Sequence, residues 1–172
     1  MWKVIVADDE PFIREALKEM IPWDELGCHL AEALKNGKEV VNAVEKYKPD
    51  IVILDIQMPL MTGMEAAQWI HENYPDIVVV LLTAYEDFKY AQQAIVFQVK
   101  RYVIKSNLFE DLPKALEEIS EELKKDNRSE KNRTEVYAGQ KNKLNDNELN
   151  KIVCNIISCM QSVDENVCME EM

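Results

Sequence analysis

Five short apolar runs, each followed by a segment of helical periodicity, most constrain how this chain can fold. The runs are continuously hydrophobic rather than alternating, which is typical of strands that helices cover on both faces of a sheet. The expected strands are WKVIVA (2–7), CHLAEAL (28–34), DIVILD (50–55), DIVVVLL (76–82) and RYVIK (101–105). The expected helices cover residues 11–21, 36–48, 62–74, 86–98 and 108–125. Right-handed β-then-α connections predict an α/β fold with a doubly wound, five-stranded parallel sheet in a three-layer αβα sandwich.

The pattern divides the chain into three parts. Residues 1–125 carry the five strand-and-helix units, and residues 126–145 are polar, asparagine-rich and typical of a linker. Residues 146–172 place apolar side chains at helical spacing, and Asn145 with Glu148 suggests a capping box. We interpret this helical C-terminal tail as a connector or dimerisation segment, with packing onto its own domain as the alternative.

Charge, hydropathy and cysteine usage limit the partners and the compartment. The chain has 20 basic and 32 acidic side chains and a net charge of -12, which repels nucleic-acid phosphates. No apolar stretch approaches membrane-spanning length, so no membrane partner is expected. Scattered cysteines without CxxC spacing fit a reducing compartment and predict a cytoplasmic protein. These cysteines are Cys28, Cys154, Cys159 and Cys168.

Polar side chains stand where the expected strands end. Asp8 and Asp9 follow the first strand, Asp55 closes the third, Thr83 follows the fourth, and Lys105 ends the fifth. Ligands bind at this edge of open parallel sheets. Clustered acids repel one another and need a cation, and Mg²⁺ takes oxygen ligands. A lysine and a hydroxyl suit phosphoryl oxygens. The combination predicts a phosphoryl-accepting aspartate.

Taken one at a time, these residues have plainer interpretations. Asp9 or Glu10 can cap the helix that begins at Pro11, and Thr83 can be an ordinary strand or capping residue. Most lysines are simply solvated. Asp55 is the hardest to explain structurally, since its alternative is satisfaction by N–H groups of the following loop. The joint placement favours the chemical interpretation.

Four motifs in order carry a family resemblance. They are VADDEP (6–11), ILDIQMPLMTG (53–63), LLTAY (81–85) and YVIK (102–105). Residues 1 to about 125 resemble the receiver domain of two-component response regulators. The resemblance implies a flavodoxin-like fold, a phosphoacceptor signalling domain rather than an enzyme, Mg²⁺ as cofactor and a sensor histidine kinase as partner.

The resemblance also implies the roles of the acidic residues. Asp55 would be the phosphoacceptor, attacking a phosphohistidine on the kinase. Asp9 and Asp55 would ligate Mg²⁺, Asp8 would assist through a bound water, and the backbone carbonyl of Gln57 would complete the protein ligands.

Three further residues would contact or report the phosphoryl group. Thr83 and Lys105 would touch it, and Tyr102 would be a rotameric aromatic switch coupled to Thr83. The alternative for Tyr102 is a half-buried strand aromatic. The segments 86–98 and 101–104, with the following helix, would form the output face.

Two departures from the family pattern alter these expectations. The family has a cis Lys-Pro bond after the last strand, whereas this chain has Lys105–Ser106. A cis bond costs ~2.5–4 kcal/mol before a non-proline residue against ~0.5–1 kcal/mol before proline, which favours a trans bond or a more mobile loop. The family also favours Gly and an acidic residue before the last strand, whereas this chain has Gln98, Lys100 and Arg101, which predict a basic patch on the output face.

The segments PWDELG (22–27) and TAYEDFKYAQQAI (83–95) resemble the receivers of YesN-like regulators, which carry an AraC-type helix-turn-helix region. Such a region needs roughly a hundred residues, more than follow Lys125. We therefore expect DNA binding only through a missing C-terminal region, with homodimerisation on phosphorylation. The alternatives are a stand-alone phosphorelay or protein-interaction module and an Mg²⁺-dependent phosphohydrolase of the haloacid-dehalogenase type. Against the phosphohydrolase, this chain lacks the second acid that such enzymes typically have two residues after the nucleophile, since Gln57 stands at that position.

Overall fold

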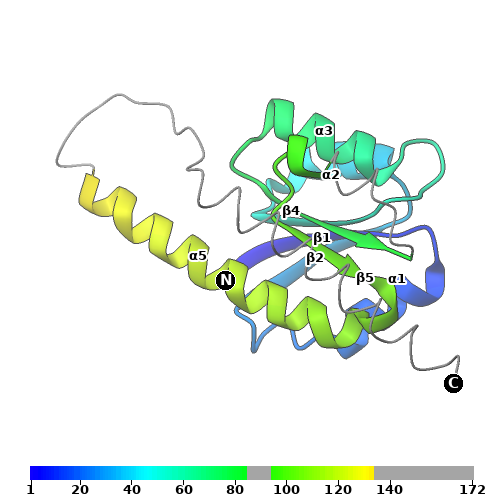
Figure 1. Ribbon diagram of the computed structural model, residues 1–172, viewed down its shortest axis with the longest axis horizontal. Coiled ribbons are helices and arrows are strands. Elements are labelled where there is room, and N and C mark those ends of the chain that lie inside the picture. The colour runs from blue at the N-terminus through cyan, green and yellow to red at the C-terminus, as the bar shows by residue number, and fades with distance from the viewer. Residues whose placement is uncertain (85–93, 134–172) are drawn as a thin grey trace, which may run out of the picture.

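Five parallel strands form one sheet in the computed structural model, which describes residues 1–84 and 94–133. The strand order is β2-β1-β3-β4-β5. The predicted doubly wound parallel sheet is confirmed (Figure 1). The strands are β1 (Trp2–Ala7), β2 (Cys28–Leu34), β3 (Ile51–Asp55), β4 (Val78–Thr83) and β5 (Arg101–Ile104).

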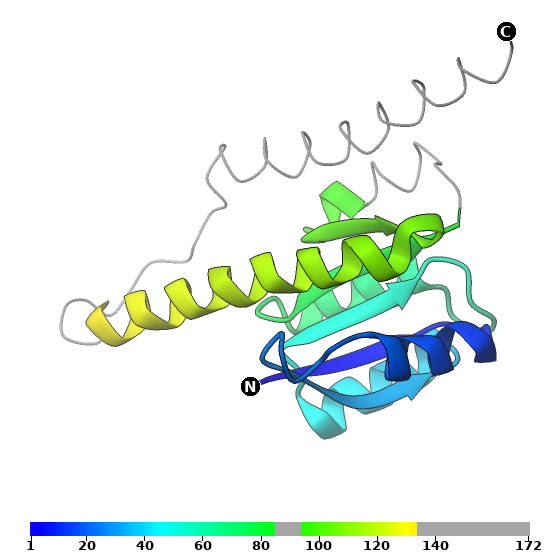
Figure 2. The same cartoon turned by 90° about the horizontal axis from the view of Figure 1, so that it is seen from below.

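Helices cover both faces of the sheet. Figures 1 and 2 show α1 and α5 on one face and α2 and α3 on the other. Their bounds are α1 (Pro11–Met20), α2 (Gly37–Tyr47), α3 (Gly63–Asn73) and α5 (Leu108–Arg133), which follows the short 3-10 turn η1 (Lys105–Asn107). Three layers result, as the sequence predicts.

Two expected segments differ in extent or fall outside the described residues. The helix expected to end at residue 125 continues to Arg133. Of the helix expected over 86–98, residues 94–96 are helical and residues 85–93 lie outside the described part. Residues 134–172, which include the expected tail, also lie outside it, so the division into domain, linker and tail stays a prediction.

The buried side chains form two cores, one on each face of the sheet. In β3, Val52 and Leu54 pack on the α2 and α3 side, whereas Ile51 and Ile53 pack on the α1 and α5 side. Successive strand residues point to opposite faces, so a strand covered on both faces is apolar throughout. This explains the continuous runs that predicted the sheet.

The edge strand β2 is only partly buried. Of the described strands it pairs with β1 alone, so it has less cover than the central strands. Its first residue, Cys28, is a buried free thiol, while the other three cysteines lie outside the described residues. In the described part of the chain, no helix is long and apolar enough to cross a membrane.

The strand order explains why the polar residues at the strand ends come together at one edge of the sheet. β1 lies between β2 and β3, so the chain leaves β1 toward one side of the sheet and later returns on its other side. A crevice forms outside the carboxyl ends of strands at such a switch point. The loops after β1 and β3 therefore meet at one edge.

Candidate functional site

Asp8 and Asp9 follow the last residue of β1. Asp8 is fully buried, whereas Asp9 is exposed. The backbone N–H of Asp8 donates to the carbonyl of Leu34 at 3.0 Å, which continues the contact with β2 for one residue beyond Ala7. The Oδ1 atom of Asp8 accepts a 2.9 Å hydrogen bond from the backbone N–H of Glu10. These contacts hold the acidic pair at the strand end.

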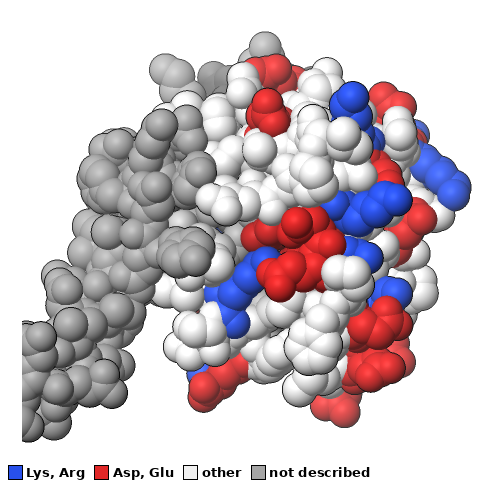
Figure 3. Space-filling model, turned by 90° about the vertical axis from the view of Figure 1, so that its right-hand side faces the viewer, with Lys and Arg blue, Asp and Glu red and all other residues white. Residues whose placement is uncertain are grey.

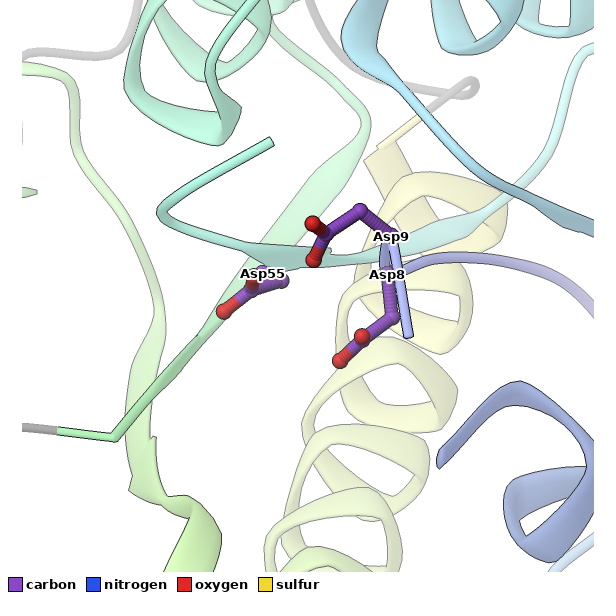
Figure 4. Close-up of side chains that lie close together, drawn as sticks. All are labelled: Asp8, Asp9 and Asp55. Carbon is purple, nitrogen blue, oxygen red and sulfur yellow. The ribbon is translucent and has the colours of Figure 1, made fainter. Parts of the chain in front are cut away.

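Asp55 is the last residue of β3 and brings a third carboxylate to the same edge. Its exposed fraction is 5%. One carboxylate oxygen from each of Asp8, Asp9 and Asp55 lies within 4.8 Å of the other two (Figure 4). Oxygen donors of this kind are what a hard divalent cation takes. The predicted acidic cluster is therefore present, and its donors suit Mg²⁺.

Lys105 directly follows the C-terminal end of β5, and its side chain reaches the acidic cluster. Its ammonium nitrogen lies 2.8 Å from Oδ2 of Asp8 and 3.2 Å from Oδ1 of Asp55. All peptide bonds of the described residues are trans, including the bond to Ser106. Of the two alternatives that the sequence left open at Lys105–Ser106, the trans bond is present, and η1 carries the lysine into the site without a proline.

Burial and the neighbouring charges together shift the pKa values of the site. Burial raises the pKa of Asp55 to about 6, since the opposing effect of Lys105 is smaller and Asp8 and Asp9 add repulsion. Burial likewise raises the pKa of Asp8. Burial lowers the pKa of Lys105, but its bonds to Asp8 and the nearby acids outweigh this and raise it overall. A pKa near 6 leaves the Asp55 carboxyl largely ionised at neutral pH, next to the positively charged Lys105.

A cavity of about 330 Å³ opens over the carboxylates. It is lined by Asp9, Glu10, Asp55, Ile56, Gln57, Thr83, Ala84 and Lys105. Figure 3 faces this edge of the sheet and shows acidic side chains gathered near its middle beside basic ones. The cavity thus brings together acid, hydroxyl and ammonium groups, with room for a small polar ligand.

Thr83 and Tyr102 lie on the same face of the sheet. Thr83 is buried at the end of β4. Leu81 of β4 pairs with Tyr102 of β5, and Thr83 pairs with Ile104. Leu81 and Tyr102 belong to the core on the α2 and α3 side, and Thr83 shares their face because strand side chains alternate. Tyr102 is half-buried and does not line the cavity.

Gly63, the first residue of α3, lies against the backbone of Asp55 and Ile56. A Cβ atom at this position would lie 2.0 Å from the backbone oxygen of Asp55. The N–H of Gly63 donates to the carbonyl of Ile56 at 3.0 Å. A capping box between Thr62 and Glu65 fixes the start of the helix. Glycine is required here for close backbone approach.

The predicted basic patch at the start of β5 is wrong. Arg101 lies 2.9 Å from Glu118 and 3.2 Å from Glu122, and Lys100 lies 2.9 Å from Glu122. Both acids project from α5. The two cations therefore tie β5 to α5 instead of forming an uncompensated positive surface.

Two residues of the site were not anticipated from the sequence. Glu10 holds Lys105 at 3.1 Å, and Arg14 of α1 donates to the backbone oxygens of Asp8 and Asp9. Glu10 occupies the position before α1, as the capping interpretation expects, but its side chain makes no capping hydrogen bond and pairs with Lys105 instead. The only sequence signal for either residue was its nearness to the acidic pair.

Comparison with known proteins gives one consistent family. The family model described as "Response regulator receiver domain" matches residues 4–117. The chain is 34% identical over 125 residues to the uncharacterized transcriptional regulatory protein YesN of Bacillus subtilis, covering 73% of this chain and 34% of that protein. It is 35% identical over 105 residues to the transcriptional regulatory protein HptR of Staphylococcus aureus, covering 61% of this chain and 41% of the relative. It spans well under half the length of these relatives.

A solved structure agrees with the sequence matches. The REC domain of AraT, a response regulator from Geobacillus stearothermophilus, superposes with a TM-score of 0.69 at 31% identity. The match covers 73% of this chain and 98% of the solved one. A CheY-like receiver domain protein from Methanospirillum hungatei shares the fold with a TM-score of 0.66 at 20% identity.

Proposed function

This chain belongs to the response regulator receiver domain family, and from that premise we propose that Asp55 accepts a phosphoryl group from a sensor histidine kinase. The observation that carries the proposal is the setting of Asp55. Its carboxylate is buried at the end of β3, beside two other acids and 3.2 Å from the Lys105 ammonium. A buried acid with an adjoining cavity and a fixed cation has a geometry suited to nucleophilic attack.

The proposed step transfers one phosphoryl group. An oxygen of the Asp55 carboxylate attacks the phosphorus of a phosphohistidine, the new P–O bond forms, and the P–N bond breaks with its electron pair returning to the imidazole. Lys105 supplies positive charge to the transferred oxygens, and the Thr83 hydroxyl donates a hydrogen bond to one of them.

The acidic cluster is proposed to hold Mg²⁺ during this step. Asp9 and Asp55 would ligate directly, Asp8 through water, and the backbone carbonyl of Gln57 would be a further ligand. When bound, the cation neutralises phosphoryl charge that would otherwise be repelled by the three acids.

Phosphorylation is proposed to change the surface formed by β5 and α5. A phosphoryl group adds nearly two negative charges and three strong acceptors. Thr83 gains a hydrogen bond only by moving toward them, and the space it leaves lies on the face that holds Tyr102. The changed surface would promote homodimerisation. It would also control a DNA-binding region that is absent from residues 1–172, and so transcription, in the cytoplasm. The names of the curated relatives support the transcriptional part.

Labelling with a small phosphodonor tests the site. We expect acetyl phosphate with Mg²⁺ to phosphorylate the wild type once, as measured by intact mass, and Asp55→Asn to remain unlabelled. Asp50→Asn is the matched control, because Asp50 precedes β3 and accepts a bond from the backbone N–H of Lys3. Labelling of Asp55→Asn to the wild-type level would overturn the assignment.

A further inference from the structure

Asp8 and Asp9 pose a geometric problem, because consecutive residues of an extended strand point to opposite faces. Both nevertheless place a carboxylate oxygen within 4.8 Å of Asp55. The backbone must therefore leave strand geometry at Asp8 and Asp9, just beyond the end of β1. Whatever fixes this turn also fixes the spacing of the acids.

The Arg14 side chain contacts the turn at two successive carbonyl groups. Its Nη1 atom donates to the backbone oxygen of Asp8 at 2.8 Å and to that of Asp9 at 2.9 Å. Arg14 projects from the first turns of α1, whose backbone is held by the bond from its own N–H to the carbonyl of Glu10. One nitrogen thus bridges the two peptide units that carry the acids, and it is anchored to a helix.

We propose that Arg14 is a positioning residue for the divalent cation: it holds the Asp8–Asp9 turn in the form that lets both carboxylates face Asp55. The guanidinium itself touches neither the carboxylates nor a reacting atom. This inference takes the cation from the proposed function, but it concerns metal affinity alone and does not require Asp55 to be phosphorylated. Groups that orient metal ligands typically change affinity by about 10–100-fold when removed.

Charge and geometry make opposite predictions for this residue. A guanidinium near a divalent cation repels it, so removing the positive charge would by itself tighten Mg²⁺ binding. Loss of the two hydrogen bonds loosens the turn and weakens binding. A purely structural role in α1 would leave the affinity unchanged. The sign of the change therefore identifies the role.

The experiment measures Mg²⁺ affinity of the full chain by amide chemical shifts, without a phosphodonor. We expect Arg14→Met to bind Mg²⁺ about tenfold more weakly than wild type. The control is Lys18→Met, which removes one positive charge a turn further along α1, where Lys18 pairs with exposed Glu15; its affinity should stay within about twofold of wild type, as expected for a solvated pair. Unchanged or tighter binding by Arg14→Met overturns the inference.

A second variant covers the case in which Arg14→Met does not fold. Arg14→Lys keeps the charge, but its side chain is shorter and its ammonium reaches the two carbonyls of Asp8 and Asp9 less well, so we expect a smaller loss of about threefold. Wild-type affinity in this variant would likewise overturn the inference. With acetyl phosphate, the Mg²⁺ concentration for half-maximal labelling should rise in the same proportion. If the wild type is never labelled, the proposed function fails while the affinity comparison still decides the role of Arg14.

Discussion

The ammonium nitrogen of Lys105 lies 3.2 Å from Oδ1 of Asp55, although β4 lies between β3, which ends at Asp55, and β5, which Lys105 follows. The same nitrogen lies 2.8 Å from Asp8. With only 11% of its side chain exposed, Lys105 is the main positive charge within the buried part of the site. It thus offsets the repulsion between acids before any ligand binds.

Lys105→Met should therefore destabilise the metal-free protein. We expect a loss of about 2–3 kcal/mol in the free energy of unfolding at pH 7.5, because two buried carboxylates lose their counterion. The loss should shrink toward pH 5, where the acids take up protons. Urea denaturation in EDTA measures both values. Lys114→Met is the control, since its exposed pairs with Glu110 and Asp111 should contribute under about 0.5 kcal/mol. Equal losses in both variants would contradict the counterion role.

The raised pKa of Asp55 predicts a stability that falls as pH rises. The native pKa is about 6 against an ordinary 3.8, so between these values the folded protein binds more protons than the unfolded chain. The free energy of unfolding of the metal-free wild type should decrease across this window. Asp55→Asn removes the effect and should be more stable at pH 7 by up to about 3 kcal/mol.

Added Mg²⁺ should reverse this order. A cation that binds the folded acids stabilises the wild type, while Asp55→Asn has lost one ligand. Denaturation from pH 4.5 to 7.5, with EDTA or with Mg²⁺, compares the two proteins. The interpretation fails if Asp55→Asn is the less stable protein in EDTA at pH 7.

Gly63→Ala should distort the backbone at Asp55. The added Cβ would meet the Asp55 carbonyl oxygen at 2.0 Å, and neither group belongs to a flexible side chain. We expect a loss of about 2–4 kcal/mol in the free energy of unfolding and slower labelling. Gly27→Ala is the comparison, because Gly27 has φ +69° but no neighbour within 4 Å. It should cost about 1 kcal/mol with labelling unchanged. Similar effects at both glycines would show that steric contact is not the cause.

The edge of the sheet could be predicted because strand ends are local signals. Continuous apolar runs located β1 and β3, and the acids directly after or within them had to meet where parallel strands end. Burial of Asp55 followed from its place in a central strand. These features depend on strand period and order, which the sequence carries directly.

Contacts between elements far apart in the sequence were harder to predict. Glu10 meets Lys105 because the segment after β1 and the turn η1 after β5 lie at the same edge of the sheet, and no local sequence pattern encodes a contact between them. The partners of Arg101 depend on how α5 lies across β5. The sequence did not predict that α5 extends to Arg133, because residues 126–133 are polar and a polar composition fits both a linker and a helix.

The pairing of β5 with α5 gives a final prediction that separates two neighbouring acids. Glu122 contacts both Lys100 and Arg101, and its side chain is 35% exposed. Among the described residues, Glu118 forms an ion pair with Arg101 alone, and its side chain is 61% exposed. Burial opposes ionisation of Glu122, but its two cationic partners outweigh this and lower its pKa. After allowance for solvent screening, Glu122→Gln should cost about 1 kcal/mol and Glu118→Gln under about 0.5 kcal/mol.

The pH dependence checks this assignment. Because the pKa of Glu122 is lowered from 4.5, the stability it supplies is fully present above that value and is lost as pH falls through its folded pKa. The difference between wild type and Glu122→Gln, measured by urea denaturation, should therefore be largest at pH 6–7 and shrink below pH 4.5. A difference that stays constant down to pH 3 would mean that packing of the side chain, and not its ion pairs with β5, accounts for the cost.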